Sequence, residues 1–239
     1  MSVENTPAHA NEIENEIIVP WSLREIIYAL ISIIFLSIGM IWVTYQWPDL
    51  TAFAMISYEL VFIIPVLVIL FIKKAAIKTL GLRRFSLENL ALGCGLLFGA
   101  YLLIMIHNML LVSFGVAPQG EYLLELFKGE DGGEGRFGVL VIAAVVIAPF
   151  AEEIFFRGFI FGGLRKKYGW KKAAIFSAGI FAIVHMQLVM LIPAFLMGFL
   201  FAYLYDRSQS IWPGVILHFT VNSFTFAMIY LLSLLESYF

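Results

Sequence analysis

The chain has 239 residues, of which 62% are hydrophobic and 13% charged, and its mean hydropathy is +0.93. Soluble domains carry about 25% charged residues, so this composition excludes a soluble globular protein and indicates an integral membrane protein. A formal net charge of −2, with neither a basic groove nor a Gly-rich phosphate loop, gives no indication of a nucleic-acid partner. The single cysteine, Cys94, excludes an intramolecular disulfide framework.

The first 20 residues are polar and acidic, and they lack the basic start and the small-residue cleavage site of a secretory signal peptide. We expect residues 1–20 to form a tail or surface segment. Residues 21–239 then form a single transmembrane domain, whose first helix is an uncleaved anchor.

Several apolar runs reach the ~20 residues that a helix needs to cross a bilayer. The sequence therefore predicts an all-α fold, a polytopic transmembrane bundle of about seven to eight helices. Seven spans are expected, at Ile26–Trp47, Thr51–Ile72, Leu87–Phe114, Phe137–Phe161, Ala173–Met190, Leu191–Tyr205 and Trp212–Leu235. Pro193 makes the boundary between the fifth and sixth spans the least defined.

The charges of the connections predict an orientation. Two connections are basic and contain no acidic residue, one from Lys73 to Arg84 and one from Arg165 to Lys172. The connection between them, residues 115–136, is mainly acidic. Because Lys and Arg accumulate on cytoplasmic loops, we expect the basic connections and the N-terminus in the cytoplasm.

Two carboxylates and an arginine interrupt the fourth predicted span. Glu153 and Arg157 are four residues apart, so they share a helix face and can neutralise one another. Glu152 is rotated by about 100° from Glu153 and lacks that partner. We therefore interpret Glu153 and Arg157 as supporting residues and Glu152 as the chemically available carboxylate. The alternative is that all three line a polar helix contact.

Two further spans carry histidines, in "FAIVH" ending at His185 and in "HFTVN" from His218 to Asn222. His218 and Asn222 are four apart and face one way. Counted along their helices, Glu152, His185 and His218 lie roughly 9–18 Å below the cytoplasmic surface. Each residue alone has a packing explanation, but three helices that bring a carboxylate and two imidazoles to similar depths favour a common site.

These side chains allow two ways to activate water. Glu152 beside an imidazole could take a proton from a water that attacks a carbonyl, with His218 and Asn222 stabilising the oxyanion. Alternatively, Glu152, His185 and His218 could bind Zn²⁺ with one position open for water; no HExxH helix is present. Glu59 and the pair His107–Asn108 are weaker candidates, interpreted as packing or lumen-facing groups.

Three motifs of this chain resemble one family. "EEIFFR", "FAIVH" and "HFTVN" match the EExxxR, FxxxH and HxxxN signatures of the CAAX prenyl protease and bacteriocin-processing family, also called CPBP or Abi, in the family's order. The resemblance covers about residues 137–222. It implies an intramembrane endopeptidase whose cavity opens to the cytoplasm, with Glu152 as the base, His185 assisting it, and His218 and Asn222 as oxyanion donors.

The resemblance implies a peptide or lipidated-protein substrate within the bilayer, in CAAX-type or bacteriocin-related processing. A bacterial Abi-type member of the plasma membrane is preferred. No cofactor is required by the glutamate mechanism, and Zn²⁺ is the alternative. A transporter-like protein or a non-catalytic bacteriocin-immunity protein are the competing functions. A transporter should show repeat symmetry, which the sequence lacks, and an immunity protein would need none of these polar groups.

Overall fold

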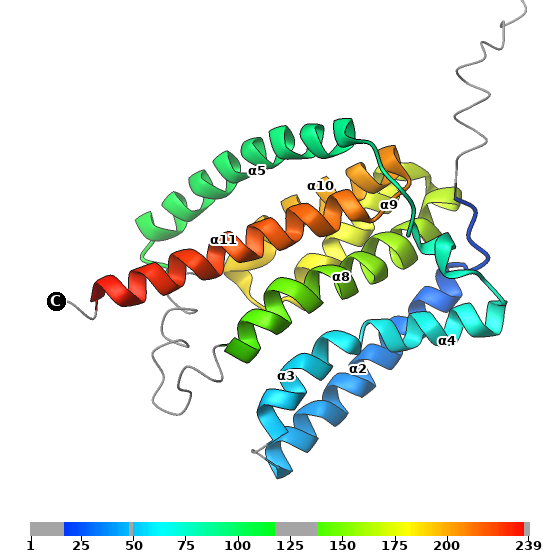
Figure 1. The fold of residues 1–239 in the computed structure, drawn as a ribbon, viewed down its shortest axis with the longest axis horizontal. Helices are drawn as coiled ribbons and strands as arrows, with labels where there is room; N and C mark the ends of the chain where they lie inside the picture. The colour runs from blue at the N-terminus through cyan, green and yellow to red at the C-terminus, as the bar shows by residue number, and fades with distance from the viewer. Residues whose placement is uncertain (1–16, 48–49, 118–137, 237–239) are drawn as a thin grey trace, which may run out of the picture.

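The computed structural model describes residues 17–47, 50–117 and 138–236. Every regular element in these ranges is helical, which confirms the all-α prediction (Figure 1). The elements are α2 (Leu23–Gln46), α3 (Thr51–Leu60), α4 (Ile63–Lys73), η2 (Ile77–Leu80), α5 (Leu87–Ser113), η3 (Ile142–Ile147), α8 (Ala148–Glu152), η4 (Glu153–Phe161), α9 (Gly162–Val184), η5 (Leu188–Met190), α10 (Leu191–Ser208) and α11 (Trp212–Glu236). Most of the acidic connection, residues 118–136, lies outside the described residues, as do residues 1–16.

Six helical stretches of the described chain are long and apolar enough to cross a membrane. One of them, Gly138–Val184, has 47 residues and is broken at Gly169, where φ is 74° and ψ is 160°. A side chain would strain this backbone, and glycine adopts it freely. The two arms fold back on one another, since Ser177 Oγ donates to the carbonyl of Phe156 at 2.7 Å. These arms correspond to the predicted spans Phe137–Phe161 and Ala173–Met190, so each of the seven predicted spans has a helical counterpart.

The basic connections gather at one end of the bundle. The described chain starts there, near η2, and α11 ends at the opposite end (Figure 1). Two hydrogen bonds join neighbouring connections at the basic end, from Ile211 N–H to the carbonyl of Gly81 and from Ser210 Oγ to that of Arg83. The described part of the chain, from residue 17 to residue 236, thus starts and ends on opposite sides of the bundle.

The core surrounds the π-helical segment η4. Phe155, Phe156, Phe159 and Phe161 are fully buried, and Phe62 of the α3–α4 junction packs on the first two. By contrast, α2 and α5 expose many large apolar side chains along their length, as expected for lipid-facing helices. The segment with the charged motif is therefore the centre of the bundle.

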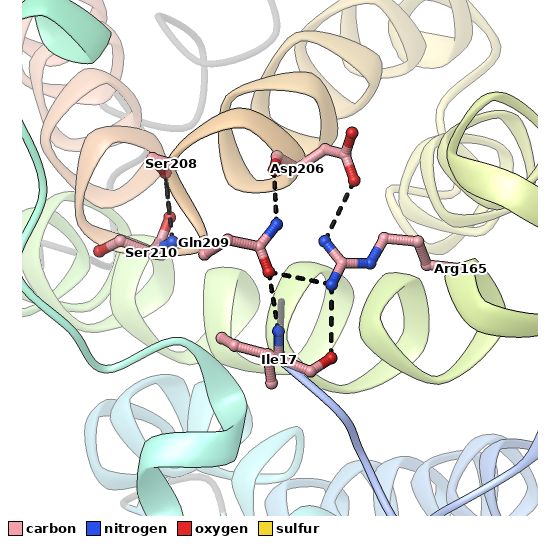
Figure 2. A network of polar contacts seen from close by, with 6 residues as sticks. All are labelled: Ile17, Arg165, Asp206, Ser208, Gln209 and Ser210. Carbon is pink, nitrogen blue, oxygen red and sulfur yellow. Dashed lines mark hydrogen bonds and ion pairs between the residues drawn. The ribbon is translucent and has the colours of Figure 1, made fainter. Parts of the chain in front are cut away.

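Part of the predicted N-terminal tail belongs to the fold. Ile17 N–H donates to Gln209 Oε1, and its carbonyl accepts from Arg165 Nη2, which also donates to Gln209 Oε1 (Figure 2). Arg165 Nη1 pairs with Asp206 at 3.1 Å. Trp21 is buried and donates from Nε1 to the carbonyl of Phe159 at 2.9 Å. These contacts attach residues 17–21 to the ends of α9 and α10 and to η4.

Close backbone approach at Gly158 gives a test of this packing. A Cβ atom there would lie 2.6 Å from the carbonyl oxygen of Leu80, so Gly158→Ala must push η2 away from η4. We expect a loss of about 1–3 kcal/mol in stability, seen as a lower midpoint of thermal unfolding in detergent. Gly99→Ala is the matched control, because nothing lies within 4 Å of a Cβ there. Equal midpoints for both variants would contradict the packing of η2 on η4.

Candidate active site

The backbone around Pro149 prepares one side of the site. The chain is π-helical over Ile142–Ile147, and Ala148 N–H bonds to the carbonyl of Ala143, five residues earlier. In this register the next carbonyl, that of Ala144, faces Pro149, which has no N–H to donate. Asn222 Nδ2 donates to it instead, at 2.7 Å. Asn222 thereby satisfies an orphaned carbonyl and joins α11 to η3.

The chain widens again at the charged motif, since α8 ends at Glu152 and η4 begins at Glu153. Arg157 Nη1 lies 2.9 Å from Glu153 Oε1, and each side chain is only 1% exposed. The Arg157 guanidinium also lies over the rings of Phe181 and Phe201, at 4.5 and 5.2 Å, and Nη2 donates to the carbonyl of Gly198. The structure therefore contains the ion pair expected from the spacing.

Gly214 is a part of this site that sequence reasoning missed. A Cβ atom at Gly214 would lie 2.5 Å from Glu153 Oε2, so α11 approaches the buried carboxylate as only glycine allows. The sequence "WPG" at the start of α11 reads as an ordinary helix beginning, in which Pro is favoured. Only the crossing of α11 over η4 reveals the need for glycine.

His218 lies between the two glutamates. Its Nε2 is 3.7 Å from Glu152 Oε2, and its Nδ1 is 3.4 Å from Glu153 Oε1. The ring stacks on Phe201, with centroids 5.4 Å apart. The sequence predicted that His218 acts with Asn222, but it did not reveal that this imidazole joins the buried pair to Glu152.

His185 ends α9 and has a defined orientation. Its Nδ1 lies 2.7 Å from the carbonyl of Phe181. A carbonyl only accepts, so Nδ1 carries the proton, and Nε2 of the neutral ring keeps its lone pair. The Phe181 ring packs edge-on against the imidazole, with centroids 4.8 Å apart. The FxxxH spacing thus provides both a ring contact and a backbone acceptor.

One cavity of about 490 Å³ brings the candidate residues together. Glu152, His185, His218 and Asn222 all line it, from α8, the end of α9, and α11. Glu153 and Arg157 do not, which agrees with their supporting position. Glu59 and Asn108 also line the cavity, whereas the sequence indicated only packing or lumen-facing roles for them. His107 is not among the lining residues; its Nδ1 lies 3.3 Å from Asn108 Oδ1.

Most of the cavity lies between the middle of the bundle and the end away from the basic connections. Its lining residues lie near the end of α3, in the second half of α5, from Leu140 to Glu152, at the end of α9, from Val189 to Phe201 and in the middle of α11. Glu152 is farther from the basic end than the sequence predicted, because its helix continues past Phe161 to the break at Gly169. The fully buried phenylalanines of η4 lie between the cavity and that end.

The donor set does not fit the predicted zinc alternative. Among the described residues, no three His, Cys, Asp or Glu side chains are grouped so that they could hold a metal ion. No step of the mechanism below is therefore routed through a metal.

Comparison with known proteins supports the motif resemblance. Residues 135–224 match the model of the family described as type II CAAX prenyl endopeptidase Rce1-like. A Bacillus subtilis protein named "Putative membrane peptidase YdiL" is 39% identical over 90 residues, 38% of this chain and 37% of that protein. "UPF0177 protein YxdF" of Lactococcus lactis is 33% identical over 80 residues, 33% of this chain and 44% of that protein. The matches thus span less than half of each curated relative. No solved structure matches.

Removal of one partner of the buried ion pair should be more harmful than removal of both. Arg157→Leu leaves the Glu153 carboxylate buried without a counter-charge, so we expect a loss of about 3–5 kcal/mol. The double variant Glu153→Leu/Arg157→Leu leaves no such charge and should recover part of this loss. Thermal unfolding of both purified variants in detergent measures the difference. A double variant as unstable as Arg157→Leu would show that the pair is not the main source of the effect.

Proposed function

We propose that this chain, which belongs over residues 135–224 to the type II CAAX prenyl endopeptidase Rce1-like family, is an intramembrane endopeptidase of the bacterial plasma membrane. The substrate is a membrane-associated protein or peptide. One observation carries the proposal: Glu152, His185, His218 and Asn222 come from separate parts of the sequence and line a single cavity within an apolar bundle. Such a combination of carboxylate, imidazoles and carboxamide suits hydrolysis by an activated water.

Glu152 is the proposed general base. It lines the cavity, and unlike Glu153 it is not committed to Arg157. A water between Glu152 and His185 Nε2 would lose a proton to Glu152 as its oxygen attacks the carbonyl carbon of the scissile bond. His218 Nε2 lies 3.7 Å from Glu152 Oε2, so the imidazole stands beside the carboxylate.

The attack forms a tetrahedral intermediate with a negative oxygen. In the proposed mechanism His218 and Asn222 stabilise this oxyanion; Asn222 uses one amide N–H for Ala144, which fixes its plane and leaves the second N–H for the substrate. Glu152 then returns its proton to the leaving nitrogen as the C–N bond breaks. The products are a carboxylic acid and an amine, and Glu152 is again ionised.

The proposed orientation differs from the sequence expectation. Positive charge places the basic connections in the cytoplasm, but the cavity occupies the opposite half of the bundle. The fully buried phenylalanines of η4 lie on the basic side of Glu152 and favour access from the other side. We infer that water and substrate reach Glu152 from the non-cytoplasmic half of the membrane, rather than from the cytoplasm.

Replacement of Glu152 tests its proposed role as the base. Glu152→Gln keeps the size of the side chain and removes the base, so we expect proteolysis to fall by at least about 10²-fold with an unchanged unfolding midpoint. Quantitative proteomics of membranes, comparing wild type with this variant, identifies substrates as peptides that persist. Glu88→Gln, on an exposed surface of α5, is the control with full activity. Full activity of purified Glu152→Gln would sink the mechanism.

Cysteine labelling tests from which side of the membrane the cavity is reached. In a Cys94→Ala background, Asn108→Cys places a thiol in the cavity, and Lys171→Cys places one in a basic connection. A membrane-impermeant maleimide applied to intact cells should label the first, and should label the second only after the membrane is permeabilised. The reverse pattern would show that the cavity opens to the cytoplasm.

A further inference from the structure

Glu59 is a second carboxylate in the cavity, and the catalytic proposal gives it no role. It lies on α3 (Thr51–Leu60), which packs against η3 and α8. Its side chain lines the same cavity as Glu152. Two acidic side chains in one cavity within the membrane need an explanation, because ionisable groups in membrane spans are usually paired.

The other acidic groups of the site have partners. Glu153 is paired with Arg157, and Glu152 lies beside His218. Glu59 Oε2 is buried and has no hydrogen-bond partner among the described residues; the Glu153 oxygens share this lack, but Glu153 has the Arg157 guanidinium beside it. A buried carboxylate oxygen without a partner costs free energy, so the free protein leaves an acceptor ready for a ligand.

The cavity offers no cation that could fill this role. Its described lining contains two glutamates and two histidines but no Lys or Arg, and Arg157 is sealed behind the wall with an exposure of 1%. The described lining therefore supplies no permanent counter-charge, and an ionised Glu59 would need a cation from a ligand or from the rest of the chain. For the same reason, the described lining has no Lys or Arg that could bind a carboxylate group of a substrate.

We propose that Glu59 determines specificity by binding a cationic group, a lysine or arginine side chain, close to the scissile bond of the substrate. The inference rests on the proposed function and narrows its substrate class. A peptide cut beside a basic residue fits this cavity. A segment that must place its own C-terminal carboxylate there is disfavoured, since it would meet two acidic side chains.

Three blocked, fluorophore-labelled heptapeptides test the proposal: acetyl-Ala-Leu-Ala-Lys-Leu-Ala-Ala-amide and the same peptide with Gln or Glu in place of Lys. Binding to full-length protein in phosphatidylcholine vesicles is measured by fluorescence anisotropy, and cleavage by mass spectrometry. For wild type we expect the Lys peptide to bind about tenfold more tightly than the Gln peptide, and the Glu peptide to bind most weakly.

Glu59→Gln should bring the Lys-to-Gln affinity ratio close to one, and Glu88→Gln should leave it unchanged. A ratio near one in wild type, or a preference that survives Glu59→Gln in folded protein, would overturn the role of Glu59. The cleavage measurement separates the two proposals. Lys-selective binding without cleavage of any peptide or of a proteomic substrate counts against the peptidase, while cleavage without Lys selectivity counts against Glu59 alone.

Discussion

The burial of the Glu153–Arg157 ion pair is the constraint around which the rest of the site is arranged. Removing two charges from water costs several kcal/mol per ion, and only good geometry with further partners offsets it. The Arg157 guanidinium contacts the rings of Phe181 and Phe201 and donates to the carbonyl of Gly198. On the other side, Gly214 leaves room for the Glu153 carboxylate. Because Glu152 directly precedes Glu153, fixing the pair also fixes the direction in which Glu152 points.

The backbone contributes as much as the side chains. Widened π-helical turns on both sides of α8 leave carbonyls outside the usual ladder and are frequent at functional sites. Pro149 turns one of them, the carbonyl of Ala144, into an acceptor that Asn222 fills. The same amide is proposed to bind the oxyanion, so a structural need and a chemical one share a residue. The two roles are compatible, because the Asn222 side chain has two N–H groups.

The parts that followed from the sequence depend on local periodicity. Span positions, the Glu153–Arg157 pairing and the different direction of Glu152 all follow from apolar run length and helical spacing. What the sequence could not reveal depends on tertiary contacts: the continuation of the fourth helix to Gly169, the hydrogen bonds of Ile17 and Trp21, and the position of Glu59 in the same cavity as Glu152. Depth counted from the predicted end at Phe161 was too shallow for the same reason. A single sequence also cannot show that His218 lies between two carboxylates.

The position of the cavity within the bundle links the proposed hydrolysis to the proposed orientation of the protein in the membrane. On the basic side of Glu152 lie the buried phenylalanines of η4 and two buried arginines, Arg157 and Arg165, which pair with Glu153 and Asp206. On the other side, a cavity of about 490 Å³ carries the remaining polar side chains. A general base of the proposed kind needs contact with the reacting water and shielding from bulk solvent, because electrostatic interactions are stronger where water is excluded. Glu152 sits at this boundary, and the direction of the open side determines which compartment can supply the peptide.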